Sequence, residues 1–69
     1  MVRRFPPPWR VRKTLGGYKV VDANGQALAY VYGRESPNAA DAAKGLTLDE
    51  ARRIAANIAR LPELLKRNP

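Results

Sequence analysis

The side chains that perform most enzymatic chemistry are scarce in this 69-residue chain. It contains no His and no Cys, which removes the commonest general base, the commonest metal ligand and any thiolate site. Ser36 precedes Pro37, a pattern typical of a helix N-cap followed by the first helical residue. We therefore interpret Ser36 as a cap, since an activated serine nucleophile needs a base beside it.

The carboxylates form no pattern that indicates catalysis or metal binding. Asp49 and Glu50 stand at a predicted helix start, and Asp22 belongs to a predicted turn. No D-x-D or E-x-x-H spacing occurs, and Gly16-Gly17 precedes no helix, unlike a phosphate-binding loop. The sequence therefore predicts a protein that is not an enzyme and has no cofactor, no metal site and no evident small-molecule substrate.

Positive charge is concentrated at the two ends of the chain. The net charge is +7. Residues 1–13 carry no acid and residues 51–69 carry only Glu63, whereas residues 14–50 are slightly acidic. This asymmetry predicts an anionic partner, with nucleic acid first. The alternative is that the charge serves solubility alone.

The most informative stretch for the fold is Tyr18 to Tyr32, in which two apolar runs flank Asn24-Gly25. That dipeptide favours a two-residue type I′ turn, because Asn and Gly tolerate positive φ best. Trp9 to Thr14 alternates between apolar and polar residues and adds a third strand before the Gly16-Gly17 turn. We expect antiparallel strands over residues 9–14, 18–23 and 26–32, in meander order.

The register of this hairpin decides which side chains share a face. A two-residue loop places Val21 opposite Leu28, Val20 opposite Ala29 and Tyr18 opposite Val31. The predicted core face then holds Tyr18, Val20, Ala27, Ala29 and Val31. With an even number of residues in the first turn, Trp9 and Val11 join that face, and the opposite face gathers Arg10, Arg12, Lys19, Tyr30 and Tyr32. An odd number exchanges the two faces of strand one, so that Arg10 and Arg12 lie on the core face instead. The sequence leaves both possibilities open.

Two helices are expected after the sheet. Ser36-Pro37 and a C′ stop at Gly45 predict a short helix over about 37–44, with a loop as the alternative. Thr47 and Glu50 form a capping box that opens the main helix. Its apolar stripe comprises Ala51, Ile54, Ala55, Ile58 and Leu61, and Pro62 ends or kinks it. Leu64 and Leu65 then cover the core or contact a neighbouring chain.

The predicted fold class is α+β, a three-stranded antiparallel meander packed against one main C-terminal helix. Residues 1–8 form a Pro-rich basic arm, which packs across the domain or offers itself to a partner groove. Residues 9–65 form the single domain and residues 66–69 a frayed tail. No apolar run reaches the roughly 20 residues of a membrane span, and the N-terminus lacks the apolar region of a signal peptide. We therefore expect a cytoplasmic protein with no membrane contact.

The basic and aromatic sheet face is the first candidate site, with Arg10, Arg12, Lys19, Tyr30 and Tyr32. Such a face can enter a DNA groove or stack on single-stranded bases. A second basic patch on the main helix adds Arg53 and Arg60 as candidates. The alternative is an ordinary solvent-exposed helix face, which commonly carries such charges. The leading hypothesis is a DNA or other nucleic-acid binding module. For the sheet face itself, the alternative is ordinary cross-strand packing of Val21, Leu28 and Tyr30, covered by the arm, the short helix or a second subunit. The rival hypothesis for the function is a protein-interaction or self-associating module, a homodimer for example, which the thin core, Leu64 with Leu65 and the apolar residues on both sheet faces favour.

Two segments carry a resemblance: PPPWRV with GGYKVVDANGQALAYVYGRE, and LTLDEARRIAANIARLPELL. Together they resemble a group of small alphaproteobacterial proteins of about this length, which brings no established function and implies no functional residues. The order of three strands and a helix also resembles the DNA-binding domains of the Apetala and integrase arm-binding type, whose sheet lies in the major groove. That resemblance is one of topology alone, because this chain lacks the fuller Arg and Trp pattern of the Apetala type.

Overall fold

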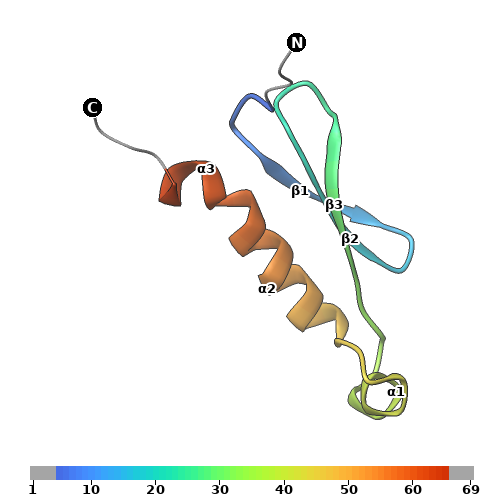
Figure 1. The fold of residues 1–69 in the computed structure, drawn as a ribbon. Helices are drawn as coiled ribbons and strands as arrows, with labels where there is room; N and C mark the ends of the chain where they lie inside the picture. The colour runs from blue at the N-terminus through green and yellow to red at the C-terminus, as the bar shows by residue number, and fades with distance from the viewer. Residues whose placement is uncertain (1–4, 66–69) are drawn as a thin grey trace.

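The computed structural model describes residues 5–65 and contains an open three-stranded sheet followed by helices (Figure 1). The antiparallel strands β1 (Arg10–Thr14), β2 (Gly17–Val21) and β3 (Ala27–Tyr32) lie in the order β1-β2-β3. The helices are α1 (Pro37–Ala43), α2 (Leu48–Ala59) and α3 (Leu61–Leu64). The predicted α+β meander with one main helix is therefore confirmed. The start of the predicted arm (1–4) and the predicted tail (66–69) lie outside the described residues.

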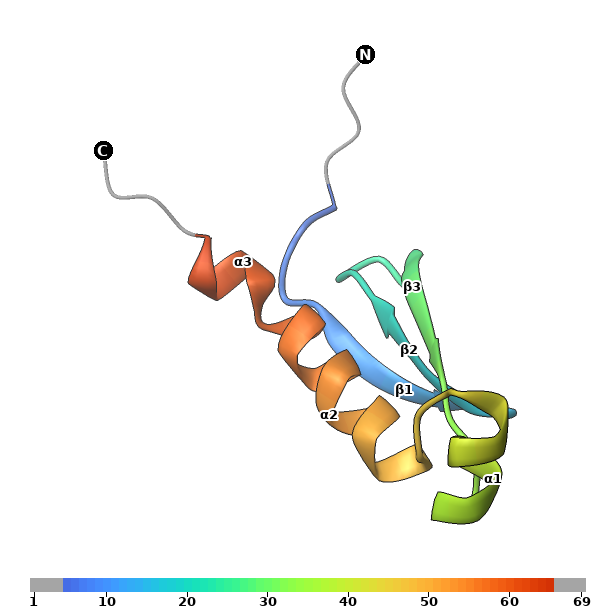
Figure 2. The ribbon, with the colours of Figure 1, turned by 60° about the horizontal axis from the view of Figure 1, so that its bottom comes forward.

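Helix α2 packs along one face of the sheet, and no other described helix covers the opposite face (Figures 1 and 2). Val20 and Val31 from the sheet meet Ala51 and Ala55 from the helix in the buried core. The two alanines are fully buried and short, so the helix axis lies close to the strands. Around this centre pack the half-buried apolar residues Trp9, Val11, Tyr18, Leu46, Ile58 and Ala59.

The apolar stripe predicted for the main helix is partly wrong. Ile54 is 41% exposed rather than buried. The helix meets the sheet through Ala51, Ala55, Ile58 and Ala59, and Ile54 lies to one side of that line on the helical wheel. Leu64 and Leu65 are also exposed, so they do not cover the core.

The turn between β2 and β3 differs from the predicted type I′ turn. Only Gly25 in this turn has positive φ, at 87°. The Asp22 N–H donates to the Gln26 carbonyl at 3.0 Å, and the Gly25 N–H donates to the Asp22 carbonyl at 3.0 Å, which encloses a three-residue loop. The buried Asp22 carboxylate accepts the N–H groups of Asn24 and Gln26 at 2.9 and 2.8 Å. These side-chain bonds favour the longer loop, as an Asx turn does.

A bulge then restores the predicted register. The longer loop pairs Val21 with Ala27 instead of Leu28, which corrects the predicted pairing at this end. Leu28 is the extra residue of the bulge, so Val20 still pairs with Ala29 and Tyr18 with Val31, as expected.

The first turn contains an even number of residues. Thr14 pairs with Gly17, so the loop is Leu15-Gly16 and Gly17 belongs to β2 rather than to the turn. Gly16 supplies the positive φ, 87°. Of the two parities left open by the sequence, this one places Arg10 and Arg12 on the same face as Lys19.

Helix α1 forms where the alternative was a loop. The Ser36 hydroxyl accepts the Ala39 N–H at 3.1 Å, as the N-cap prediction requires. The predicted stop at Gly45 is wrong in detail, because Lys44 takes the left-handed conformation (φ 53°, ψ 41°). The Gly45 N–H instead donates to the Ala40 carbonyl at 2.9 Å.

The capping box at the start of α2 is confirmed. Thr47 Oγ1 accepts the Glu50 N–H at 3.1 Å, and Glu50 Oε1 accepts the Thr47 N–H at 3.0 Å. The end of β3 is joined to this point, because the Arg34 N–H donates to the Leu46 carbonyl at 2.7 Å and the Arg34 carbonyl accepts the Leu48 N–H at 2.9 Å. The segment from 35 to 46, with α1, is thereby closed into a loop (Figure 2).

Candidate functional site

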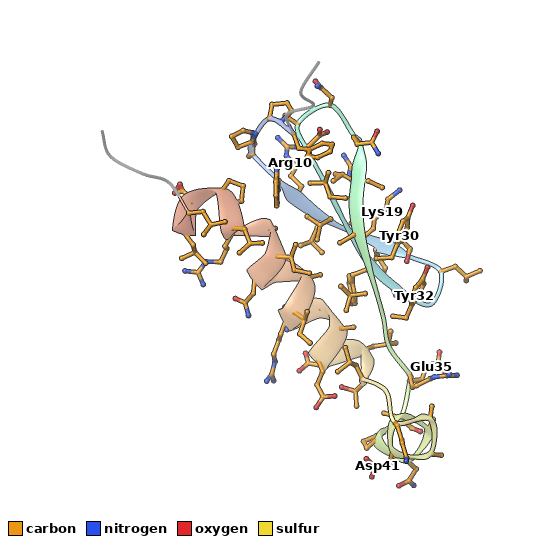
Figure 3. The ribbon with its side chains drawn as sticks, in the orientation of Figure 1. Arg10, Lys19, Tyr30, Tyr32, Glu35 and Asp41 are labelled. Carbon is orange, nitrogen blue, oxygen red and sulfur yellow. The ribbon has the colours of Figure 1, made fainter. Side chains whose placement is uncertain are left out.

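The sheet face turned away from α2 brings together five of the seven residues predicted for a site. We name it the open face and define it as Arg10, Arg12, Lys19, Tyr30 and Tyr32. Figure 3 shows Lys19, Tyr30 and Tyr32 projecting from the sheet on the side opposite α2. Lys19 is half-buried, and the other four side chains are exposed.

Three of these side chains form a single row across the sheet. Arg12 lies opposite Lys19, and Lys19 lies opposite Tyr30. Neighbouring strands are about 4.8 Å apart, so these two cationic residues and one aromatic residue extend from backbones at that spacing. Among residues 5–65, both ion pairs are made by Asp49 on α2, and none involves Arg10, Arg12 or Lys19. The row is therefore a focus of uncompensated positive charge.

The two tyrosines at the edge of the sheet are stacked. The ring centroids of Tyr30 and Tyr32 are 6.2 Å apart, and their planes differ by 8°. The residues are 53% and 63% exposed, which leaves ring surface open to solvent. Tyr32 pairs with Gly17, where a side chain would collide with the β3 backbone. A glycine at this position therefore allows the backbones of β2 and β3 to lie close together beside Tyr32.

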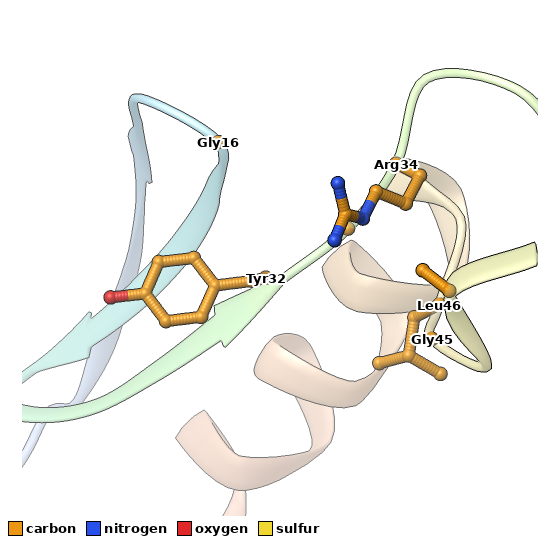
Figure 4. Close-up of a pocket in the computed structure, with 7 residues that line it drawn as sticks. Gly16, Tyr32, Arg34, Gly45 and Leu46 are labelled. Atoms are coloured by element: carbon orange, nitrogen blue, oxygen red, sulfur yellow. The ribbon is translucent and has the colours of Figure 1, made fainter. Parts of the chain in front are cut away.

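A depression of about 390 Å³ adjoins the open face at the end of β3 (Figure 4). Its lining comes from the β1–β2 turn, the end of β3 with the residues after it, the last residue of α1 and the link between α1 and α2. It comprises Gly16, Tyr32, Gly33, Arg34, Ala43, Gly45 and Leu46. Tyr32 belongs to both the open face and the depression. Arg34 was missed from the sequence, although it continues the alternation of Tyr30 and Tyr32 on one face.

The two helical candidates lie apart from the open face. Arg53 forms an ion pair with Asp49 Oδ2 at 2.7 Å, and Arg52 donates a hydrogen bond to Asp49 Oδ1 at 3.0 Å, all on the exposed side of α2. The hydrogen bond from Arg52, followed by the charge of Arg53, holds the pKa of the Asp49 carboxyl below its ordinary value. Part of the predicted helical patch is thus neutralised within the helix.

Arg60 stands at the far end of α2. It lines a second depression, of about 580 Å³, with Pro7 and Pro8 from the arm, with Trp9 and with residues of the α2–α3 junction. The structure therefore does not bring Arg60 together with Arg53 or with the sheet residues.

The described part of the arm is bonded to the domain. The Ala23 N–H donates to the Pro6 carbonyl at 2.9 Å, and Trp9 Nε1 donates to the Phe5 carbonyl at 3.0 Å. Of the two alternatives for the arm, its described residues 5–8 thus adopt the packed one, at the β2–β3 turn.

Comparisons with models of protein families, with curated proteins and with solved structures found no match. Over residues 5–65, no helix has both the length and the apolar character needed to cross a bilayer. Nor do acidic side chains of the same residues gather into a group that could hold a metal ion. The interpretation of the site therefore rests on its geometry.

Proposed function

We propose that this protein is a non-enzymatic module that binds nucleic acid through the open face. The observation that carries the proposal is the row from Arg12 through Lys19 to Tyr30. Its two cations form no ion pair within residues 5–65, and α2 does not cover it. Like charges directly opposite each other on neighbouring strands destabilise a sheet. A polyanion supplies the compensating charge.

The chemistry of the face suits a nucleic acid better than a generic anion. Guanidinium and ammonium groups bind phosphate oxygens and release condensed counterions. Tyrosine rings stack on bases, which a simple anion lacks. Arg12 and Tyr30 lie on the two outer strands, roughly 10 Å apart, so one ligand can contact both through its backbone and its bases.

Salt-dependent binding tests the proposal. Fluorescently labelled single-stranded and duplex oligonucleotides are titrated with the full chain at several salt concentrations. We expect the logarithm of the affinity to fall linearly with the logarithm of salt, with a slope of about −0.7 to −0.9 for each phosphate neutralised. Failure to bind either ligand at low salt, or an affinity independent of salt, would contradict the proposal.

A matched pair of variants separates the open face from net charge. One variant carries Arg10→Gln, Arg12→Gln and Lys19→Gln, and the other carries Arg52→Gln, Arg53→Gln and Arg60→Gln on the helix. Both lose the same charge. We expect only the first to lose most of its affinity and to show a slope smaller by up to about 3, one for each phosphate contact removed. Equal losses would assign the binding to overall charge.

Self-association is a second candidate function, favoured by apolar side chains exposed on the helices. Ile54, Leu64 and Leu65 are 41%, 60% and 70% exposed, and Val20 is the largest fully buried side chain of the core. Small cores commonly need support from a second chain. Sedimentation at increasing protein concentration tests this candidate: a dimer that Leu64→Ser with Leu65→Ser abolishes would support it, and a strict monomer would exclude it.

A further inference from the structure

We infer that the ligand is single-stranded, and that one of its bases stacks on Tyr32 within the depression that Arg34 lines. This inference rests on the proposed function and names its ligand class. Its basis is the distribution of charge and rings over the three strands, and the position of the depression next to only one of the two stacked tyrosines.

The open face separates cations from rings. Arg10 and Arg12 come from β1, Lys19 comes from β2, and both tyrosines come from the edge strand β3. A duplex presents a phosphate backbone on both sides of each groove, so a sheet lying in a groove needs cations on both flanks. A single strand has its backbone on one side and its bases on the other. The cationic flank and aromatic flank of this sheet match the single strand.

The ring surfaces of Tyr30 and Tyr32 can stack only on bases whose faces are not already covered by neighbouring bases. In a duplex the base faces are covered by their neighbours, and only base edges reach the grooves. A single strand offers its base faces to aromatic rings, and such stacking tolerates any sequence. Since the two rings are parallel within 8°, bases stacked on them lie in nearly parallel planes, as consecutive bases do.

The depression provides the place in which one base can stack on Tyr32, at the end of the stacked tyrosine pair. Tyr32 lines it and Tyr30 does not, so it adjoins the ring of Tyr32 on the side away from Tyr30. Gly16 and Gly45 contribute no side chains to fill it. Its volume of about 390 Å³ falls within the range of small-molecule sites.

Arg34 supplies the charge at this point. Its N–H donates to the Leu46 carbonyl at 2.7 Å and its carbonyl accepts the N–H of Leu48, the first residue of α2, at 2.9 Å, so its side chain starts from a fixed position. No ion pair within residues 5–65 engages its guanidinium group. Figure 4 shows that group extending beside the depression toward Tyr32. Arg34 lies beyond the end of β3, outside the aromatic flank itself, so the phosphate it binds is the one that follows the last stacked base.

The test compares a single strand with a duplex of the same sequence and length, using the full chain. We expect the single strand to bind at least about ten-fold more tightly. We expect Tyr32→Leu to weaken single-strand binding roughly 5- to 100-fold, whereas Tyr32→Phe, which keeps the ring, binds like the parent chain. Arg34→Gln lowers the salt slope by about 1, and Arg53→Gln, with the same loss of charge, leaves it unchanged.

The possible failures are distinguishable. Loss of binding to both ligands would remove the proposed function together with this inference. Equal or tighter binding of the duplex would overturn the inference and leave the proposed function standing. Parent-like binding by Tyr32→Leu, with an unchanged circular dichroism spectrum, would overturn the seating of a base on this ring. Ring-proton NMR signals give an independent readout, since a stacked base shifts the Tyr32 signals upfield and a phosphate contact alone does not.

Discussion

Arg12 lies directly opposite Lys19 on the neighbouring strand, and neither side chain has an ion-pair partner within residues 5–65. The sheet therefore holds two like charges at the position where a favourable cross-strand pair would stabilise it most directly. On a domain with so small a core, this arrangement lowers stability and is consistent with a role in binding.

Lys19→Glu should separate stability from binding. The new carboxylate lies opposite Arg12, so repulsion becomes attraction, and we expect the free energy of unfolding to rise by about 0.2–1 kcal/mol. Nucleic-acid affinity should fall, because a cation at the centre of the open face becomes an anion. Urea denaturation and oligonucleotide titration measure the two effects. Lys19→Gln is the control, with weaker binding and a smaller gain in stability; a destabilised Lys19→Glu chain would refute the proposed pairing.

Gly17→Ala should disrupt the sheet. A β-carbon at this position would overlap the Val31 carbonyl oxygen and lie 2.8 Å from the Tyr32 Cα, so β2 and β3 must separate. We expect a loss of about 1–3 kcal/mol or more in the free energy of unfolding. Gly45→Ala is the matched control, because nothing lies within 4 Å of its added carbon and its φ is not left-handed. It should change stability by less than about 1 kcal/mol, in the stabilising direction.

Asp22→Ala should weaken the β2–β3 turn more than Asn24→Ala does. The Asp22 carboxylate accepts two backbone N–H groups, and its loss is expected to lower the free energy of unfolding by about 1–3 kcal/mol. Asp22→Asn keeps one acceptor oxygen and should lie in between. Asn24 is exposed and does not use positive φ, so Asn24→Ala should stay within about 0.5 kcal/mol. Thermal unfolding of the three variants gives the order, and a larger effect at Asn24 would restore the type I′ interpretation.

The ion pairs of Asp49 predict a small dependence of stability on acid pH. The folded pKa of this carboxyl lies below its ordinary value because of the Arg52 hydrogen bond and then the Arg53 charge. Its contribution is therefore complete above the unfolded pKa, about 4, and is lost as pH falls through the folded pKa. An NMR titration of the carboxyl carbon should show a lowered midpoint that rises in Arg52→Gln. A midpoint unmoved by that change would disprove the assignment.

Much of the fold could be predicted because local signals agree with tertiary packing. Alternation in Trp9 to Thr14, the cap at Ser36 and the capping box at Thr47 each correspond to an observed element. The turn type could not be predicted from Asn24-Gly25 alone, because the deciding bonds come from the Asp22 side chain. A bulge at Leu28 then compensated for the longer loop, which is why the register beyond it was still predicted correctly.

The composition of the site was less predictable than the fold. Arg10 and Arg12 lie on the open face only because the first turn has an even number of residues, and the sequence does not fix that number. Arg34 was missed, although it continues the alternation of Tyr30 and Tyr32, because it lies two residues beyond the end of the strand. Arg53 was included because a linear charge count does not show its pairing with Asp49.

Helix α1 contacts none of the other described helices or strands, and the chain leaves and rejoins the domain at Arg34 and Leu46. The segment between them can therefore gain or lose residues during evolution with little effect on the core, provided that its two closing hydrogen bonds persist. Its last residues also form a wall of the depression beside Tyr32. Length variation in this one loop would thus reshape the depression while the scaffold stays the same, so this segment is the place to alter, by design, the ligand preference that we propose for it.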